Sequence, residues 1–268
     1  MQEIQGISGI GLQALYSQIL LLFICSLRVG AFLVASPFFG SRMIPLQIRI
    51  VFSVVLALGV LMIAALPDIS IFFSEKLIII IVMEIVIGIS AGMALTICFA
   101  AVQLAGEKIA STSGLSFASQ LDPANGSQSP VISQIFSLFL LVLFFSANGH
   151  LFIFKAIYKS FEIYPLGVTG RSQHFIQTTL NASGIVYEKA AIIALPIVVV
   201  LFFMNVGIGF ITKSAPQLNL FSFGFPMTIL GTFLALYFSV DALQYAFNDL
   251  LDTALSVVDK LLLGAGDG

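Results

Sequence analysis

Two ionisable side chains, Arg28 and Glu84, lie inside long apolar stretches of the 268-residue sequence. A charged group that faces lipid is costly, because hydrocarbon offers it neither water nor a counter-ion. Each of the two is therefore expected to face protein or water and to have a polar partner. The chemistry allows an Arg28–Glu84 salt bridge, but the sequence alone does not bring the two residues together.

Glu84 is followed by glycines at intervals of four, Gly88 and Gly92. On an α-helix this spacing places the three residues on one face. Glycines there let another helix approach closely. Two roles fit the pattern: helix packing around a satisfied carboxylate, which we favour, and a carboxylate that relays ions. We therefore predict that Arg28, Glu84, Gly88 and Gly92 are helix-packing and buried polar positions.

No catalytic or metal-binding set converges in the sequence. His150 and His174 lack a Cys, Asp or second His at ligand spacing. Cys25 and Cys98 lie within apolar runs, where a thiol usually acts as a small hydrophobe. The HExxH, P-loop and nucleophile-elbow motifs are absent. We predict no catalytic site, no metal, no cofactor and no enzymatic activity.

A polar connector, Gly106–Pro130, reads GEKIASTSGLSFASQLDPANGSQSP and carries an apolar island at Leu115 and Phe117. Connections between packed helices usually have about 2–8 residues, and longer ones are often functional or disordered. Glycine tolerates unusual backbone dihedrals, and Asp122-Pro123 favours a turn. A moving gate and a passive loop are both compatible with this pattern.

The composition restricts where these groups can lie. The chain is 59% hydrophobic and 9% charged, with a mean hydropathy of +1.10. Soluble domains have about 45–50% apolar and about 25% charged residues. So little charge cannot cover a surface in water, which predicts a membrane protein. The net charge of −2 gives no basic field, so we predict no nucleic-acid partner.

The elements that position these residues are expected to be helices. The apolar segments have roughly the 20 residues of a spanning helix and lack the alternation of an outer-membrane strand. The last of them is short for a span unless residues beyond Ser239 extend its helix. The segments are Ile10–Pro37, Ile48–Leu66, Leu77–Ala105, Val131–Gly149, Ala190–Thr212 and Phe225–Phe238. We predict an all-α, membrane-associated bundle of about six long, kinked helices.

Short stretches in a fixed order along the chain indicate a family. They are Leu27-Arg28 before Ala35-Ser36-Pro37, Ile44-Pro45, Glu84 with Gly88 and Gly92, Ala105-Gly106-Glu107 leading into Gly114-Leu115-Ser116-Phe117 and Asp122-Pro123, Asn148-Gly149-His150-Leu151, Pro165-Leu166-Gly167, Ala215-Pro216-Gln217-Leu218, and Gly224-Phe225-Pro226. Together they resemble the FliR/SctT family of flagellar biosynthetic and type III secretion export-gate proteins. Its motif positions include Asn148, Gly149, His150, Pro216, Gln217 and Pro226.

The resemblance implies a subunit of the flagellar type III secretion export gate, which forms and closes the pore for unfolded flagellar subunits. It implies partners similar to FliP, FliQ and FlhB, and a place in the bacterial inner (cytoplasmic) membrane at the flagellar basal body. Within one export-gate domain, 1–268, it implies a FliP-like part, 1–180, and a FliQ-like helical hairpin, 181–268.

The family closes its pore with a loop that corresponds here to Gly106–Asp122. The implied plug residues are Gly106, Glu107, Gly114, Leu115, Phe117, Asp122 and Pro123. The alternative function is a small-solute channel or secondary transporter. It predicts paired intramembrane carboxylates or broken helices in corresponding halves of the chain.

Overall fold

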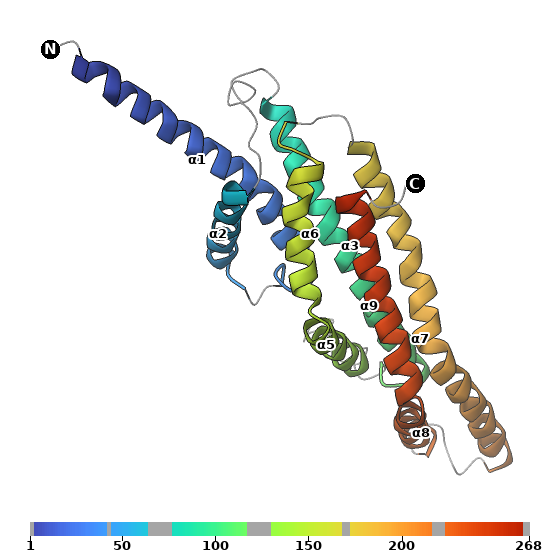
Figure 1. Cartoon of the computed structure of the whole chain (residues 1–268). Coiled ribbons are helices and arrows are strands. Elements are labelled where there is room, and N and C mark those ends of the chain that lie inside the picture. The colour runs from blue at the N-terminus through green and yellow to red at the C-terminus, as the bar shows by residue number, and fades with distance from the viewer. Residues whose placement is uncertain are drawn as a thin grey trace. The chain divides into compact units, whose positions relative to one another are not determined.

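The computed structural model describes residues 3–41, 44–63, 77–116, 130–167, 172–215 and 223–264. Helices joined by turns account for these residues, and no strand occurs among them. In chain order (Figure 1) the helices are α1 (Glu3–Ala35), α2 (Leu46–Ile63), α3 (Leu77–Thr112), α5 (Val131–Ser146), α6 (Gly149–Ile163), α7 (Ser172–Ser214), α8 (Phe225–Phe238) and α9 (Val240–Leu263). The predicted all-α class is confirmed.

The six predicted apolar segments correspond to six of these helices; α8 has the predicted ends, and the others differ at one end or both. α3 continues past Ala105 to Thr112, and α7 begins at Ser172 rather than at Ala190. Polar side chains on one face of a helix lower its mean hydropathy without interrupting its backbone hydrogen bonds. The same effect explains why α6 and α9 were not among the predicted apolar segments: their charged residues lower the mean hydropathy.

Within the described ranges, three helices are long and apolar enough to cross a membrane: α1 over Leu15–Ala35, α3 over Leu77–Thr112 and α7 over Gln173–Ser214. The pairs α5 with α6 and α8 with α9 meet the same criterion, each with a sharp bend at a short break. The bend between α8 and α9 is 67°. Pro196 lies inside α7, where it removes one backbone donor from the helix.

The described chain divides into two compact units. One comprises Met1–Thr96, His150–Asn181 and Leu255–Gly268, and the other comprises Ile97–Gly149 and Ala182–Ala254. Because α3, α7 and α9 run through both, the units are interleaved along the sequence. The implied division into 1–180 and 181–268 is a division along the chain and remains a prediction.

In the first unit, α2 packs against α1 (Figure 1). α6 also reaches α2, because the Tyr158 hydroxyl donates a 3.0 Å hydrogen bond to the carbonyl of Leu56. Gly59 leaves room for this ring, since a Cβ there would lie 2.6 Å from the Tyr158 oxygen. The rings of Phe39, Phe52 and Phe154 pack together nearby, with centroids 5.8–5.9 Å apart.

In the second unit, α3 packs against the start of α5 at Gly106. A Cβ at Gly106 would lie 2.6 Å from Cα of Ser133. The Ser133 hydroxyl donates a 3.0 Å hydrogen bond to the carbonyl of Gln103, again on α3. α5 meets α9 where the rings of Phe136 and Phe247 pack edge to face at 5.4 Å.

Much of the apolar surface is exposed. Large side chains such as Met62, Phe203 and Phe238 are 90%, 68% and 81% exposed, respectively. So many exposed large apolar side chains indicate contact with lipid or with other protein chains. The predicted membrane-associated character of the bundle is confirmed by these surfaces and by the three long apolar helices.

Candidate functional site

A buried ion pair joins α1 and α3. The Nε and Nη2 atoms of Arg28 donate to the two carboxylate oxygens of Glu84 over 2.7 and 3.0 Å. Both residues are almost fully buried, with 1% and 2% of their surface exposed. The fork geometry of a guanidinium matches a carboxylate in this bidentate way. The sequence had not brought the two residues together, and the fold does.

α6 completes the surroundings of the guanidinium. Nη1 of Arg28 donates to the hydroxyl of Ser160 over 3.0 Å, and Nη2 also donates to the carbonyl of Tyr164 over 2.8 Å. The guanidinium carbon lies 3.9 Å from the centroid of the Phe161 ring, a cation–π distance. Arg28 therefore links three helices that are far apart in the sequence.

This arrangement fits a structural role better than an ion relay. Both oxygens of Glu84 accept hydrogen bonds from Arg28, and the carboxylate is 2% exposed. An ion carrier needs a carboxylate that water or an ion reaches. A buried charge that is paired and hydrogen-bonded instead fixes the register of the helices that carry it.

Gly88 and Gly92 lie where α3 is closest to α1. A Cβ at Gly88 would be 2.2 Å from the carbonyl oxygen of Arg28, and one at Gly92 would be 2.7 Å from that of Phe32. One turn further on, the Thr96 hydroxyl donates a 2.7 Å hydrogen bond to the carbonyl of Ala35. The Glu84-Gly88-Gly92 face of α3 is thus the face that contacts α1.

The predicted plug residues are divided between a helix and the segment that follows it. Gly106 and Glu107 lie within α3, so the connector begins after Thr112 rather than at Gly106. Gly106 is buried against α5, and close packing rather than mobility accounts for a glycine there. Gly114 has a φ of 81°, which favours glycine, and Leu115 is half-buried. Phe117, Asp122 and Pro123 lie outside the described residues.

The described residues among the other motif positions lie at helix ends. Asn148 has a φ of 56° in the turn between α5 and α6. A Cβ at Gly149 would be 2.5 Å from the Phe144 ring, so the turn has no room for a larger residue. His150 belongs to the first turn of α6, and Pro226 lies at the start of α8, where a missing N–H costs nothing. Pro216 and Gln217 lie outside the described residues.

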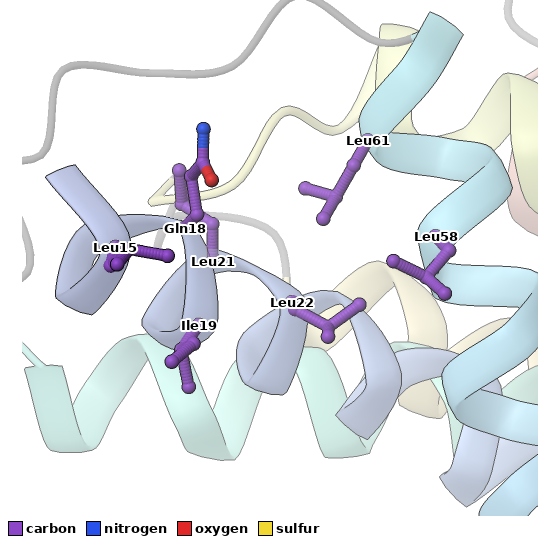
Figure 2. A pocket seen from close by; sticks show the side chains of 7 residues that line it. All are labelled: Leu15, Gln18, Ile19, Leu21, Leu22, Leu58 and Leu61. Atoms are coloured by element: carbon purple, nitrogen blue, oxygen red, sulfur yellow. The ribbon is translucent and has the colours of Figure 1, made fainter.

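The groove between α1 and α2 offers little chemistry. It has a volume of about 310 Å³, and Figure 2 shows the side chains that line it: Leu15, Gln18, Ile19, Leu21, Leu22, Leu58 and Leu61. The Gln18 amide is its only polar side chain, and an amide is neither an acid, a base nor a nucleophile. Among the described residues, no three His, Cys, Asp or Glu side chains are grouped to hold a metal ion.

Comparison with known proteins places the chain in a family. The family model described as bacterial export proteins, family 1, matches residues 19–254. The chain belongs to this family. The match includes the ion pair, the glycine face of α3 and the end of that helix, so it covers the sites described above.

Individual members of the export family match most of the chain. The flagellar biosynthetic protein FliR of Bacillus subtilis is 30% identical over 94% of this chain and 97% of its own length. FliR of Escherichia coli is 30% identical over 76% of this chain and 77% of its own length. The surface presentation of antigens protein SpaR of Shigella flexneri is 30% identical over 69% and 72%. The resemblance found in the sequence motifs is confirmed.

Sequence reasoning missed some functional contacts of this export protein. Ser160 and the Tyr164 carbonyl bind Arg28, but a single serine in a polar connector and a backbone carbonyl give no signal in the sequence. A second ion pair, from Nζ of Lys189 to Oδ2 of Asp249 at 2.5 Å, joins α7 to α9 in the other unit. Asp249 lies on α9, beyond the last predicted apolar segment, so it was not singled out.

Proposed function

We propose that this chain is the FliR-type subunit of the flagellar type III secretion export gate, where it helps to form and close the pore for unfolded flagellar subunits. The observation that carries this proposal is the family match over residues 19–254, together with FliR relatives that match up to 94% of the chain. The all-helical fold with three long apolar helices is the architecture such a subunit needs. In this role the chain acts as a structural secretion component without catalysis.

The proposed partners are FliP-like, FliQ-like and FlhB-like subunits in the bacterial inner membrane at the flagellar basal body. The exposed apolar side chains support an assembly, because they need a covering partner or lipid. Gly207 on α7 has open space where a Cβ would be, which leaves room for close approach of another helix at this position. The FliP-like part, 1–180, and the FliQ-like hairpin, 181–268, are part of the same proposal.

Closure is assigned in this proposal to the segment that follows α3. A plug must block ions at rest and yet yield to a polypeptide. Apolar side chains such as Leu115 and Phe117 can exclude ions by packing together and keeping water out. Gly114, in a conformation that favours glycine, gives the segment a point about which to turn.

The test is the ion conductance of the purified complex in liposomes. Replacing the island with polar residues, Leu115→Ser with Phe117→Ser, should make the resting complex leak small ions while the subunits still co-purify. The matched control, Leu115→Ile with Phe117→Leu, keeps the side chains apolar and should stay tight. Low conductance in an intact complex with both serines would remove the plug role.

A further inference from the structure

A second groove lies between α1, α2 and α3 in the first unit. Its volume is about 550 Å³, within the range of about 300–1,000 Å³ that small-molecule sites have. Small residues form part of its lining: Gly30 on α1 faces Ser53 on α2, and a Cβ at Gly30 would lie 3.6 Å from that of Ser53. Phe23, Val34 and Ile50 also line it, and each is more than half exposed. The groove is therefore open to whatever surrounds these helices.

One positive charge stands out in a lining that is otherwise mostly apolar. Ser26 and Ser53 donate their hydroxyl protons to carbonyls of their own helices, at Phe23 and Ile50, over 2.7 and 2.8 Å. These two hydroxyls therefore have no proton left to donate to a ligand. Arg49 on α2 is the one charged residue in the described lining. The groove thus combines an apolar interior with a single cation.

The charge of Arg49 is not paired with a carboxylate of the described residues. Its Nη2 atom donates to the carbonyls of Ser41 and Ile44, whereas its Nε is buried and has no acceptor in the described part of the chain. Arg28, by contrast, binds both oxygens of a carboxylate. A guanidinium matches a phosphate in the same way as it matches a carboxylate. Arg49 therefore retains the capacity to bind an anion.

Arg49 lies at the end of the groove where the apolar span of α1 ends. That span ends at Ala35. The turn after it folds back onto α1, because a Cβ at Gly40 would lie 2.5 Å from the carbonyl oxygen of Val34. Ser41 follows directly, and its carbonyl binds the guanidinium of Arg49. Basic groups between helices at this depth are where lipid headgroups bind.

The length of the groove matches one acyl chain. Along α1 the lining runs from Phe23 to Val34, a distance of about 16 Å at about 1.5 Å per residue. Half of the hydrocarbon core of a bilayer is about 15 Å thick. A chain that begins at the headgroup level beside Val34 would therefore end near Phe23, at the middle of the bilayer.

We propose that this groove binds an anionic phospholipid, with one acyl chain along α1 and α2 and the headgroup phosphate at Arg49. A phospholipid carries its negative charge at the end of its apolar chains, which is the arrangement that the groove requires. A partner helix would have to bring an acidic side chain to this one point. The bound lipid would cover the exposed faces of Val34 and Ile50 and supply the counter-ion of Arg49. This lipid site is independent of how the pore closes.

The probe is a phosphatidylglycerol with a photoreactive group in one acyl chain, and a zwitterionic phosphatidylcholine with the same chains is the reference. The purified complex is reconstituted with a trace of each probe in vesicles of otherwise identical composition, irradiated and digested. Mass spectrometry then identifies the labelled peptides. We expect label on the α1 and α2 peptides that line the groove. It should be about 5-fold stronger from phosphatidylglycerol, because one Arg near the surface favours an anionic lipid by about that factor.

Two pairs of variants separate the charge from the space. Arg49→Gln removes the charge and should abolish the preference for phosphatidylglycerol, whereas Arg49→Lys keeps the charge and should keep the preference. Gly30→Leu places a large side chain in the groove without a backbone clash, since the nearest atoms are 3.6 Å away on the Ser53 side chain, and it should lower the groove label from both lipids. Gly184→Leu adds the same side chain in open space on α7 and should leave the label unchanged.

Equal labelling of the groove by the two lipids, or an unchanged preference in Arg49→Gln, would overturn the proposal. So would an absence of label on the groove peptides of the unmodified complex. A photoreactive residue in place of Ser26 tests the competing occupant, because a crosslink to another protein chain instead of lipid would show that a partner helix fills the groove. If Arg49→Gln is not recovered as a complex, Gly30→Leu decides: full groove label in that variant would overturn the site.

Discussion

The buried pair of Arg28 and Glu84 allows a sharp test of why this fold is stable. Glu84→Gln keeps the size of the side chain and opens no cavity. Its amide oxygen can accept one hydrogen bond from Arg28, but its NH₂ group then faces a second guanidinium donor. The change leaves a positive charge in a site that is 1% exposed. Removing one partner of a buried pair in this way costs about 3–5 kcal/mol.

Removing the charge of Arg28 and removing that of Glu84 should have different costs in stability. Arg28→Met strands a carboxyl group, which can take up a proton and become neutral, whereas a guanidinium stays charged. Arg28→Met should therefore cost less than Glu84→Gln. Replacing both residues by Met removes both charges from the site, and such replacements are often neutral or stabilising. The double variant should recover most of the loss caused by Glu84→Gln.

The assay measures the thermal unfolding midpoint of the detergent-solubilised complex. The midpoint is obtained from the fraction of the complex that stays monodisperse after heating. With about 2–4 °C per kcal/mol for chains of 150–250 residues, Glu84→Gln should lower the midpoint by about 6–20 °C. Arg28→Lys, which keeps the charge but loses the fork, gives an intermediate control. A double Met variant that is no more stable than Glu84→Gln, or a shift below about 2 °C for Glu84→Gln, would refute the reasoning.

Three further variants test other contacts. Gly88→Leu should lower recovery of the complex in a pull-down, because even a Cβ there would be 2.2 Å from an α1 carbonyl oxygen. Gly184→Leu on α7, with open space around it, is the control and should be recovered normally. Tyr158→Phe loses one 3.0 Å hydrogen bond to the carbonyl of Leu56, so it should lower the free energy of unfolding by about 1 kcal/mol in a melting experiment. No change would mean that this hydrogen bond is no more favourable than one to water. Gly106→Ala should destabilise the complex on heating, since its Cβ would be 2.6 Å from the α5 backbone; a neutral result would show that α5 shifts easily.

The sequence predicted those features that depend on averages over a helix. Long apolar runs identified α1, α3 and α8, and for α8 both ends agree with the prediction. The cost of a charge in an apolar run was enough to single out Arg28 and Glu84 as residues that need partners. The glycine spacing after Glu84 identified the face of α3 that meets α1.

The sequence could not predict features that depend on how the helices align in space. The partner of Arg28 could be named only when the register between α1 and α3 was known, and α6 added contacts from a region that appeared to be a connector. The close packing of Gly106 against α5 could not be predicted for a related reason. A sequence does not distinguish a glycine that permits motion from a glycine that permits close packing. The Ser133 backbone beside Gly106 shows that this glycine permits close packing.

The ion pair also sets an order of events during synthesis. Arg28 and Glu84 are 56 residues apart, which at about 5–20 residues per second separates their synthesis by roughly 3–11 seconds. The Ser160 hydroxyl comes 132 residues after Arg28, or roughly 7–26 seconds later at the same rate. Throughout that time the newly made α1 carries a positive charge whose final surroundings do not yet exist. The first helix of this chain therefore reaches its settled position only after α6 has left the ribosome.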